Sequence, residues 1–156
     1  EVYVLTAKNG VMRSLDGGQE FSELKASTAK ITGGAEISLG ALQIYRSTVI
    51  LTVVTRAGIL SSDDRGESWK VLPLLTSGRQ ITPITAFAVS PTRADRMVYA
   101  TATTIVRSID GGSQWTVVNA PTKLSPSVLV FDPKNPDKII LGMAELKSKG
   151  SGFTGF

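Results

Sequence analysis

Three stretches share the pattern Ser-x-Asp-x-Gly-x-x-aromatic: Ser14-Leu15-Asp16-Gly17-Gly18-Gln19-Glu20-Phe21, Ser62-Asp63-Asp64-Arg65-Gly66-Glu67-Ser68-Trp69 and Ser108-Ile109-Asp110-Gly111-Gly112-Ser113-Gln114-Trp115. Their serines are 48 and 46 positions apart (62 − 14 and 108 − 62), and an apolar segment precedes each one. That period is typical of a four-stranded propeller blade of roughly 40–50 residues.

The chemistry of the pattern is local. Glycine at the fifth position permits the positive φ that a tight hairpin needs. The Asp carboxylate can accept backbone N–H bonds inside the turn, and the Ser hydroxyl can add another. The aromatic residue starts the next strand and is placed to pack under the turn. We therefore assign structural roles to Ser14, Asp16, Gly18, Phe21, Ser62, Asp64, Gly66, Trp69, Ser108, Asp110, Gly112 and Trp115. The two Trp residues are expected to pack blades, and Arg13 and Arg107, each directly before a motif serine, to lie on strand surfaces.

This pattern resembles the Asp box, or bacterial neuraminidase repeat. It is similar to the repeats of sialidases, xyloglucan-active glycoside hydrolases (xyloglucanases), sortilin-type receptors and Ycf48-like photosystem II assembly factors. The resemblance covers nearly the whole chain and implies an all-β fold of β-propeller blades, each of four antiparallel strands with an Asp-box hairpin. One fold hosts many functions, so the resemblance specifies function poorly.

The chain is expected to be a single propeller segment, 1–156. Val2–Thr6, Val11–Ser14 and Glu20–Leu24 are predicted to form a partial blade (1–25). Two complete blades follow: Glu36–Ile44, Thr48–Thr55, Gly58–Ser61 and Ser68–Leu72 (36–72), then Ile84–Ser90, Met97–Ala102, Thr104–Ser108 and Gln114–Val118 (84–118).

A second repeat predicts a fourth, partial blade (128–156). Val89-Ser90-Pro91-Thr92-Arg93-Ala94-Asp95 matches Phe131-Asp132-Pro133-Lys134-Asn135-Pro136-Asp137, which places strands at Val128–Phe131, Lys138–Met143 and Gly152–Phe156. About three and a half blades are fewer than the roughly four to eight of a typical ring. The chain is therefore expected to be part of a larger propeller, with a small ring closed by its own ends or by two copies as the alternative.

Composition limits the chemistry. The chain has no His and no Cys, so disulfides, thiolate metal sites, Cys nucleophiles and imidazole triads are excluded. No metal and no cofactor are expected. The net charge of +4 does not by itself indicate nucleic acid, and no specific nucleic-acid binding is predicted. No apolar run approaches the roughly 20 residues of a membrane span.

The expected loops divide into two sides. Every Asp falls on the side of the Asp-box turns, whereas the opposite side carries a candidate basic binding face: Lys8, Lys25, Lys30, Arg56, Arg79, Lys123, Lys147 and Lys149. Its acids are Glu145 and, at the edge, Glu36. Glycoside hydrolysis needs two carboxylates that flank the bond, about 5 to 9.5 Å apart. No such catalytic pair was recognised.

We therefore expect no enzymatic activity and predict a non-catalytic scaffold or assembly module for protein–protein interaction, Ycf48-like or an accessory subunit of a larger complex. Its partner would be a protein with an acidic surface, or the remaining blades of the same propeller. The alternative is a fragment of a glycoside hydrolase, sialidase-like or xyloglucanase-like, or a carbohydrate-binding propeller whose catalytic residues lie outside this chain. The location is predicted to be extracytoplasmic: periplasmic, secreted or on a lumenal membrane face.

Overall fold

The described part of the structure, a computed structural model, consists of β-strands and turns. It covers residues 1–6, 10–24, 39–44, 51–55, 58–75, 84–121 and 124–145. Within these ranges there is no helix, and therefore no helix that is long and apolar enough to cross a membrane. The strands are β1 (Val2–Thr6), β2 (Gly10–Ser14), β3 (Ser22–Glu23), β4 (Leu39–Ile44), β5 (Leu51–Thr55), β6 (Gly58–Ser62), β7 (Lys70–Leu72), β8 (Ala86–Val89), β9 (Met97–Ala100), β10 (Thr104–Ser108), β11 (Thr116–Asn119), β12 (Ser125–Phe131) and β13 (Ile139–Ala144).

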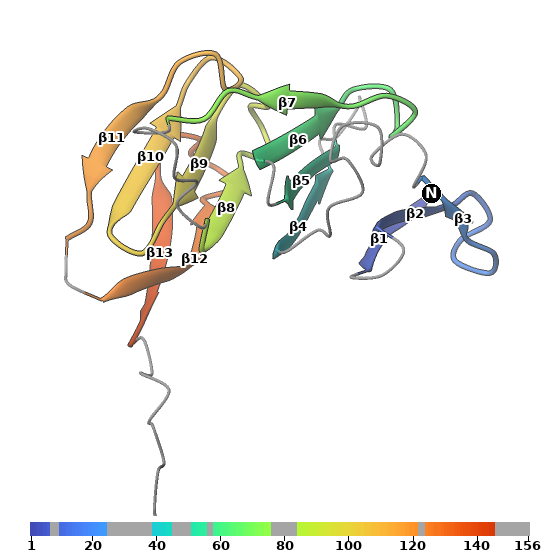
Figure 1. Cartoon of the computed structure of the whole chain (residues 1–156), viewed down its shortest axis with the longest axis horizontal. Helices are drawn as coiled ribbons and strands as arrows, with labels where there is room; N and C mark the ends of the chain where they lie inside the picture. The colour runs from blue at the N-terminus through green and yellow to red at the C-terminus, as the bar shows by residue number, and fades with distance from the viewer. Residues whose placement is uncertain are drawn as a thin grey trace, which may run out of the picture.

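The strands form four antiparallel sheets in which chain neighbours are also sheet neighbours (Figure 1). Their orders are β1-β2-β3, β4-β5-β6-β7, β8-β9-β10-β11 and β12-β13. Short turns make such a meander straightforward, because antiparallel strands need only a hairpin between them. The predicted all-β fold class, with sheets of antiparallel strands in chain order, is confirmed.

In the first three sheets, the last strand begins later than the sequence predicted. We expected strands from Glu20, Ser68 and Gln114, but β3, β7 and β11 begin two residues further on, at Ser22, Lys70 and Thr116. The reason is local: the backbone N–H groups of Glu20, Ser68 and Gln114 bind the turn carboxylates and are not free for the ladder. The expected strand Gly152–Phe156 lies outside the described residues.

Each sheet packs face to face against the next one, and the period of two along a strand decides which side chain meets which neighbour. Ile59 on β6 packs towards the third sheet, whereas Leu60, the next residue, packs towards the first. On β8, Phe87 and Val89 join the core shared with the second sheet, and Ala86 and Ala88 join the core shared with the fourth. Three cores therefore lie between sheets.

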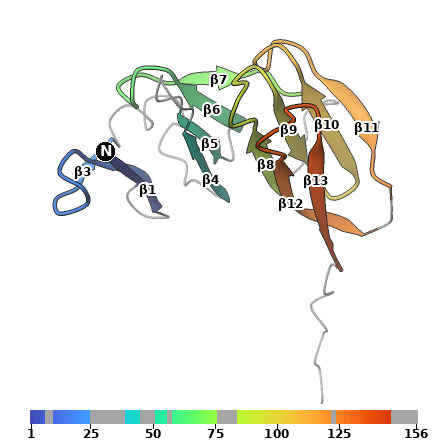
Figure 2. The same cartoon turned by 180° about the vertical axis from the view of Figure 1, so that it is seen from behind.

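On the side of the third sheet, the interface with the fourth sheet contains three alanines beside Val98 and Ile105. Ala86, Ala88 and Ala100 form the β8–β9 face, and they meet Leu129 and Phe131 of β12. Small side chains allow β12 to approach β8 closely, and the two strands are in contact. The first strands of the sheets, β1, β4, β8 and β12, follow one another in contact, so the sheets are stacked in chain order. Figures 1 and 2 show the first three sheets side by side.

Candidate functional site

The three Ser-x-Asp-x-Gly turns, which connect β2–β3, β6–β7 and β10–β11, share one hydrogen-bond pattern. In the last, Ser108 Oγ donates to Asp110 Oδ1 at 2.8 Å and accepts the N–H of Gly112 at 2.9 Å. The same two bonds measure 2.6 and 2.8 Å at Ser14, and 2.8 and 2.8 Å at Ser62. All three serine side chains are buried. The serine hydroxyl therefore satisfies the inner backbone donor of each turn.

The Asp carboxylates lie outside this buried layer and accept hydrogen bonds from the backbone at the end of each turn. Asp110 accepts the N–H of Gln114 at 2.8 Å, Asp64 that of Ser68 at 2.9 Å, and Asp16 that of Glu20 at 3.0 Å. The glycines at the fifth position adopt positive φ, 102° at Gly18, 88° at Gly66 and 89° at Gly112. The carboxylates thus form hydrogen bonds within their own turns.

These hydrogen bonds lower the pKa of all three carboxyl groups, because they favour the ionised form. The Ser68 hydroxyl is the main cause at Asp64, where the pKa falls to about 2. The Ser14 hydroxyl lowers the pKa of Asp16, and the Gln114 N–H lowers that of Asp110. A general acid needs a raised pKa instead. The turn carboxylates are therefore unsuited to donate a proton to a leaving group.

The aromatic residues at the end of the pattern differ in burial. Trp69 is buried between the first and second sheets, and its Nε1 donates to Gly66 O at 3.1 Å. Trp115 is only partly buried; it contacts Tyr99 edge to face at 4.9 Å, and its Nε1 donates to Pro73 O in the preceding sheet. Phe21 is 38% exposed. Phe21 still lies near its own turn, since its ring would be 4.0 Å from a Cβ at Gly18.

Arg13 and Arg107 do not simply lie on strand surfaces, as the sequence suggested. Arg13 Nη1 pairs with Glu67 Oε1 in the β6–β7 turn at 2.9 Å, and Arg107 Nη2 pairs with Asp137 Oδ1 in the β12–β13 loop at 3.0 Å. Both arginines thus reach from one sheet to the next. In the second sheet the equivalent residue is Ser61, which is buried.

Most carboxylates on the side of the turns have a partner of opposite charge. Lys70 pairs with Asp63 at 3.3 Å, Arg93 with Asp95 at 2.6 Å, and Lys138 with Asp132 at 3.1 Å. The pKa of Asp95 is lowered by the Arg93 hydrogen bond, and that of Asp132 by the N–H of Lys134. Each carboxyl group of the described part that has a displaced pKa has it displaced downward.

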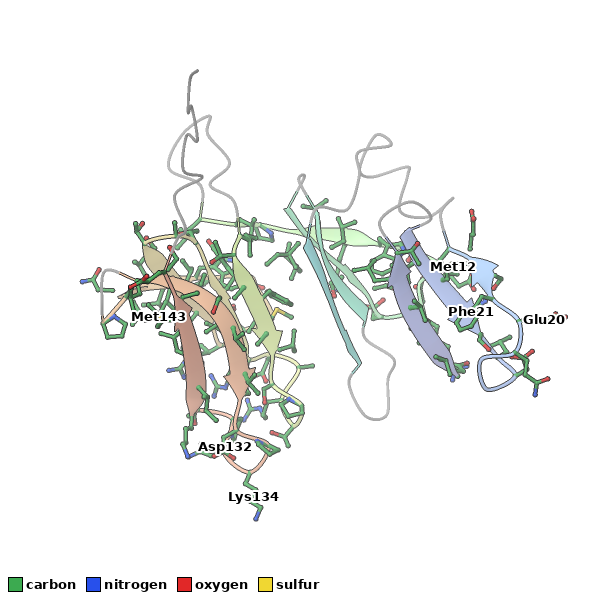
Figure 3. All side chains as sticks on the ribbon, turned by 90° about the horizontal axis from the view of Figure 1, so that it is seen from below. Met12, Glu20, Phe21, Asp132, Lys134 and Met143 are labelled. Atoms are coloured by element: carbon green, nitrogen blue, oxygen red, sulfur yellow. The ribbon has the colours of Figure 1, made fainter. Side chains whose placement is uncertain are left out.

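The loops of neighbouring strands meet on this same side. The N–H of Gly111, in the β10–β11 turn, donates to Asp95 O in the β8–β9 loop at 3.0 Å. Figure 3 shows one such loop at each end of the row of sheets, marked by Glu20 and by Asp132 and Lys134. In the described ranges, no group of three or more acidic residues lies close enough to hold a metal ion.

The opposite side is represented by few described residues. All eight residues of the candidate basic face lie outside them, as does Glu36: Lys8, Lys25, Lys30, Arg56, Arg79, Lys123, Lys147 and Lys149. That face stays a prediction. Glu145 is described; it is exposed and directly follows β13, at the end of that strand away from the β12–β13 loop.

No family model and no curated protein matches the chain. Solved structures do. An ancestral GH74 enzyme matches with a TM-score of 0.61 and 19% identity, over 90% of this chain and 20% of that one. The GH74 enzyme of Niastella koreensis matches with a TM-score of 0.63 and 20% identity, over 86% of this chain and 22% of that one.

These matches show that the chain has a fold like that of the two GH74 enzymes, and they contradict the prediction that the chain is not an enzyme. Both of these solved structures with a similar fold are enzymes. The earlier inference relied on the missing carboxylate pair. That reasoning fails physically, because the chain spans about a fifth of the length of those enzymes and need not itself contain both carboxylates. What the comparisons establish is the propeller fold of the chain.

Proposed function

We propose that this chain forms part of a glycoside hydrolase propeller that acts on a polysaccharide. The observation that carries the proposal is the likeness to two GH74 enzymes over 86–90% of the chain. The Asp-box pattern of the sequence supports it independently, since the pattern resembles the repeats of xyloglucan-active glycoside hydrolases. We favour this function over the non-catalytic, Ycf48-like scaffold, for which the fold comparisons give no support.

The turn side of the described sheets has a structural part in this proposal. Its carboxylates are hydrogen-bonded or ion-paired, and Asp16, Asp64 and Asp110 have a lowered pKa. A glycoside hydrolase needs one carboxylic acid and one carboxylate that flank the glycosidic bond. The opposite side is therefore where we place the polysaccharide, and Glu145 is the described acid that fits it best. It is exposed and forms no ion pair within the described part of the chain.

An extracytoplasmic location fits a polysaccharide substrate, because such polymers lie outside the cell membrane. The basic face predicted for this side suits an acidic protein or an anionic polymer, and its charge gives no attraction for a neutral polysaccharide. The location is part of the proposal, and the basic face stays a prediction.

The test is hydrolysis of a substrate panel by the protein expressed from its complete reading frame. Reducing ends are measured after incubation with xyloglucan, carboxymethylcellulose, arabinoxylan and a sialylated oligosaccharide. We expect turnover of a neutral β-linked polysaccharide. Release of sialic acid alone would move the protein to the sialidases, and no hydrolysis of any substrate would overturn the proposal.

A pair of variants tests the choice of side. Glu145→Gln should lower kcat by about 10²-fold or more if this carboxyl transfers a proton to or from the reacting group. Glu20→Gln is the matched control, since Glu20 is also exposed and unpaired in the described part but lies on the turn side. Equal activity of both variants would exclude Glu145 from the catalytic site. The proposal that the protein is a glycoside hydrolase would then still stand on the substrate panel.

A further inference from the structure

The third sheet ends on its outer side in a strand with one free edge. The sheet order places β11 at that edge, and Figures 1 and 2 both show it at the outside of the sheet. All four of its residues are exposed, and within the described part of the chain its backbone bonds only to β10. In an antiparallel edge strand, every second residue directs its N–H and C=O away from the sheet. These groups are therefore available to pair with a further strand.

Additional blades of a longer propeller would not cover this edge. The three inter-sheet cores show that neighbouring sheets meet through their faces. At the opposite edge of the third sheet, β8 is buried along its whole length and contacts β4 and β12, whereas β11 is exposed along its whole length. A further blade would lie beside a face of the first or the fourth sheet, and it would leave the outer edge of the third sheet accessible.

The sequence of β11 lacks the features that usually protect a sheet edge. Natural edge strands are kept from pairing by short length, charged side chains or Pro. The outer strand β3 has two residues, one of them Glu23, and β7 has three and begins with Lys70. In contrast, β11 has four residues and lies within the stretch 111–122, which has no charged side chain. The next Pro, Pro121, comes after the end of the strand. Of the outer strands β3, β7 and β11, the last is therefore best suited to pair.

A strand added at this edge would also bury an apolar side chain. Val117 lies opposite Val106, whose side chain belongs to the core shared with the second sheet. Directly opposite residues share a face, so Val117 points to the side of the second sheet, yet it is 54% exposed. Cross-strand neighbours on one face contact each other, and a β-branched or aromatic residue opposite a valine stabilises the pair. Val117 thus favours an apolar residue at one position of the added strand.

We propose that the free edge of β11 binds an extended, uncharged segment of a partner protein as a fifth strand of this four-stranded sheet. Main-chain hydrogen bonds supply the affinity of such strand addition, and contacts of alternate side chains supply the specificity. A helix does not suit this edge, because its own backbone groups are already bonded to one another. A charged segment would find no opposite charge along 111–122. The proposal goes beyond glycoside hydrolysis and does not depend on it.

The test uses the protein expressed from its complete reading frame and a fluorescein-labelled peptide, Thr-Val-Thr-Val-Thr-Val, as the probe. The same peptide with every backbone nitrogen methylated is the control, because it cannot donate main-chain hydrogen bonds. Val117→Lys places a charge at the edge. Leu15→Lys is the matched variant, since Leu15 is also an exposed apolar residue, at 66%, but lies in the β2–β3 turn. Fluorescence anisotropy measures binding, hydrogen–deuterium exchange shows which segment is covered, and circular dichroism confirms that each variant folds.

We expect the unmethylated peptide to bind the wild-type protein and Leu15→Lys equally, and Val117→Lys at least about tenfold more weakly, because a lysine at a sheet edge opposes pairing. Binding should slow exchange in β11 and leave β7 unchanged, and the methylated peptide should not bind. This last comparison holds without any substitution.

No binding to the wild-type protein, or equal binding of the methylated peptide, would overturn the proposal. Slow exchange of β11 in the free protein would overturn it too, since the edge would then already be covered. Dimerisation that Val117→Lys abolishes would overturn it in favour of a second copy as the occupant.

Discussion

Replacement of Ser108 by Ala tests which atom holds the hairpin turns together. The Ser108 side chain is 1% exposed, donates to Asp110 Oδ1 and accepts the N–H of Gly112. Alanine removes a single oxygen and leaves the Gly112 N–H buried without that acceptor. An unsatisfied buried donor costs about 1–3 kcal/mol of folding free energy. In a domain of this size each kcal/mol lowers Tm by about 2–4 °C, so we expect a fall of roughly 2–12 °C.

The measurement is urea unfolding followed by tryptophan fluorescence, with a thermal melt beside it. The chain contains two Trp residues, and Trp115 lies at the end of the hairpin that the substitution affects. Ser113→Ala is the matched control in the same turn, because its hydroxyl donates to Asp110 O at 3.1 Å but is exposed. Exposed changes of this kind usually stay within about 0.5 kcal/mol. If both variants lose the same stability, the buried Ser–Gly bond is not what fixes the turn.

Three further predictions concern the stability of the turns and of the contact between the third and fourth sheets. Gly112→Ala should lower the free energy of unfolding, measured in urea, more than Gly111→Ala does. Both residues have positive φ, which costs about 1–2 kcal/mol once a Cβ is present. Only the Cβ at Gly112 would also contact a side chain of the neighbouring sheet, that of Leu72, at 3.2 Å. Equal losses would contradict the close approach. Asp137→Asn should cost at most about 1 kcal/mol, because the Asp137 side chain is 60% exposed beside its partners Arg107 and Arg96. The loss should shrink in 1 M salt, and a loss that is the same at high salt would contradict an ionic contact. Acid should destabilise the turns. The pKa of Asp64 is about 2 in the folded chain and about 4 in the unfolded chain. The contribution of Asp64 to folding free energy is therefore complete above pH 4 and is lost as the pH falls towards 2. Asp64→Asn should flatten that part of the stability–pH curve, and an unchanged slope would contradict the assignment.

The strands and their order could be predicted because the signals for them are local. Each hairpin is defined by eight consecutive residues, and its hydrogen bonds join residues two to four apart, as from Ser108 to Asp110 and Gly112. The alternation of apolar residues in the neighbouring strands supplied the rest. Even the late start of the last strands has a local cause, since the turn carboxylates bind N–H groups that were assigned to those strands.

The contacts between sheets could not be predicted in the same way. Arg13 meets Glu67, 54 residues later, and Arg107 meets Asp137, 30 residues later. A signal did exist: both arginines directly precede a motif serine, and the turn side collects the acids. The two ion pairs were not predicted because a residue in an alternating strand is normally assigned either to the core or to the solvent. Whether it instead contacts the neighbouring blade depends on how the two blades pack, which the sequence of one strand does not show.

The error about enzymatic activity has a related origin. The repeat is strong because it serves the turns, and it therefore draws attention to carboxylates whose hydrogen bonds lower their pKa and commit them to structure, such as Asp64 and Asp110. A catalytic acid needs the opposite environment, one that raises its pKa. Such a residue has no reason to recur with every blade, so a repeat cannot reveal it. Under the proposed function, the turn side serves the fold, and the catalytic acid has to be sought among single, unrepeated acids such as Glu145.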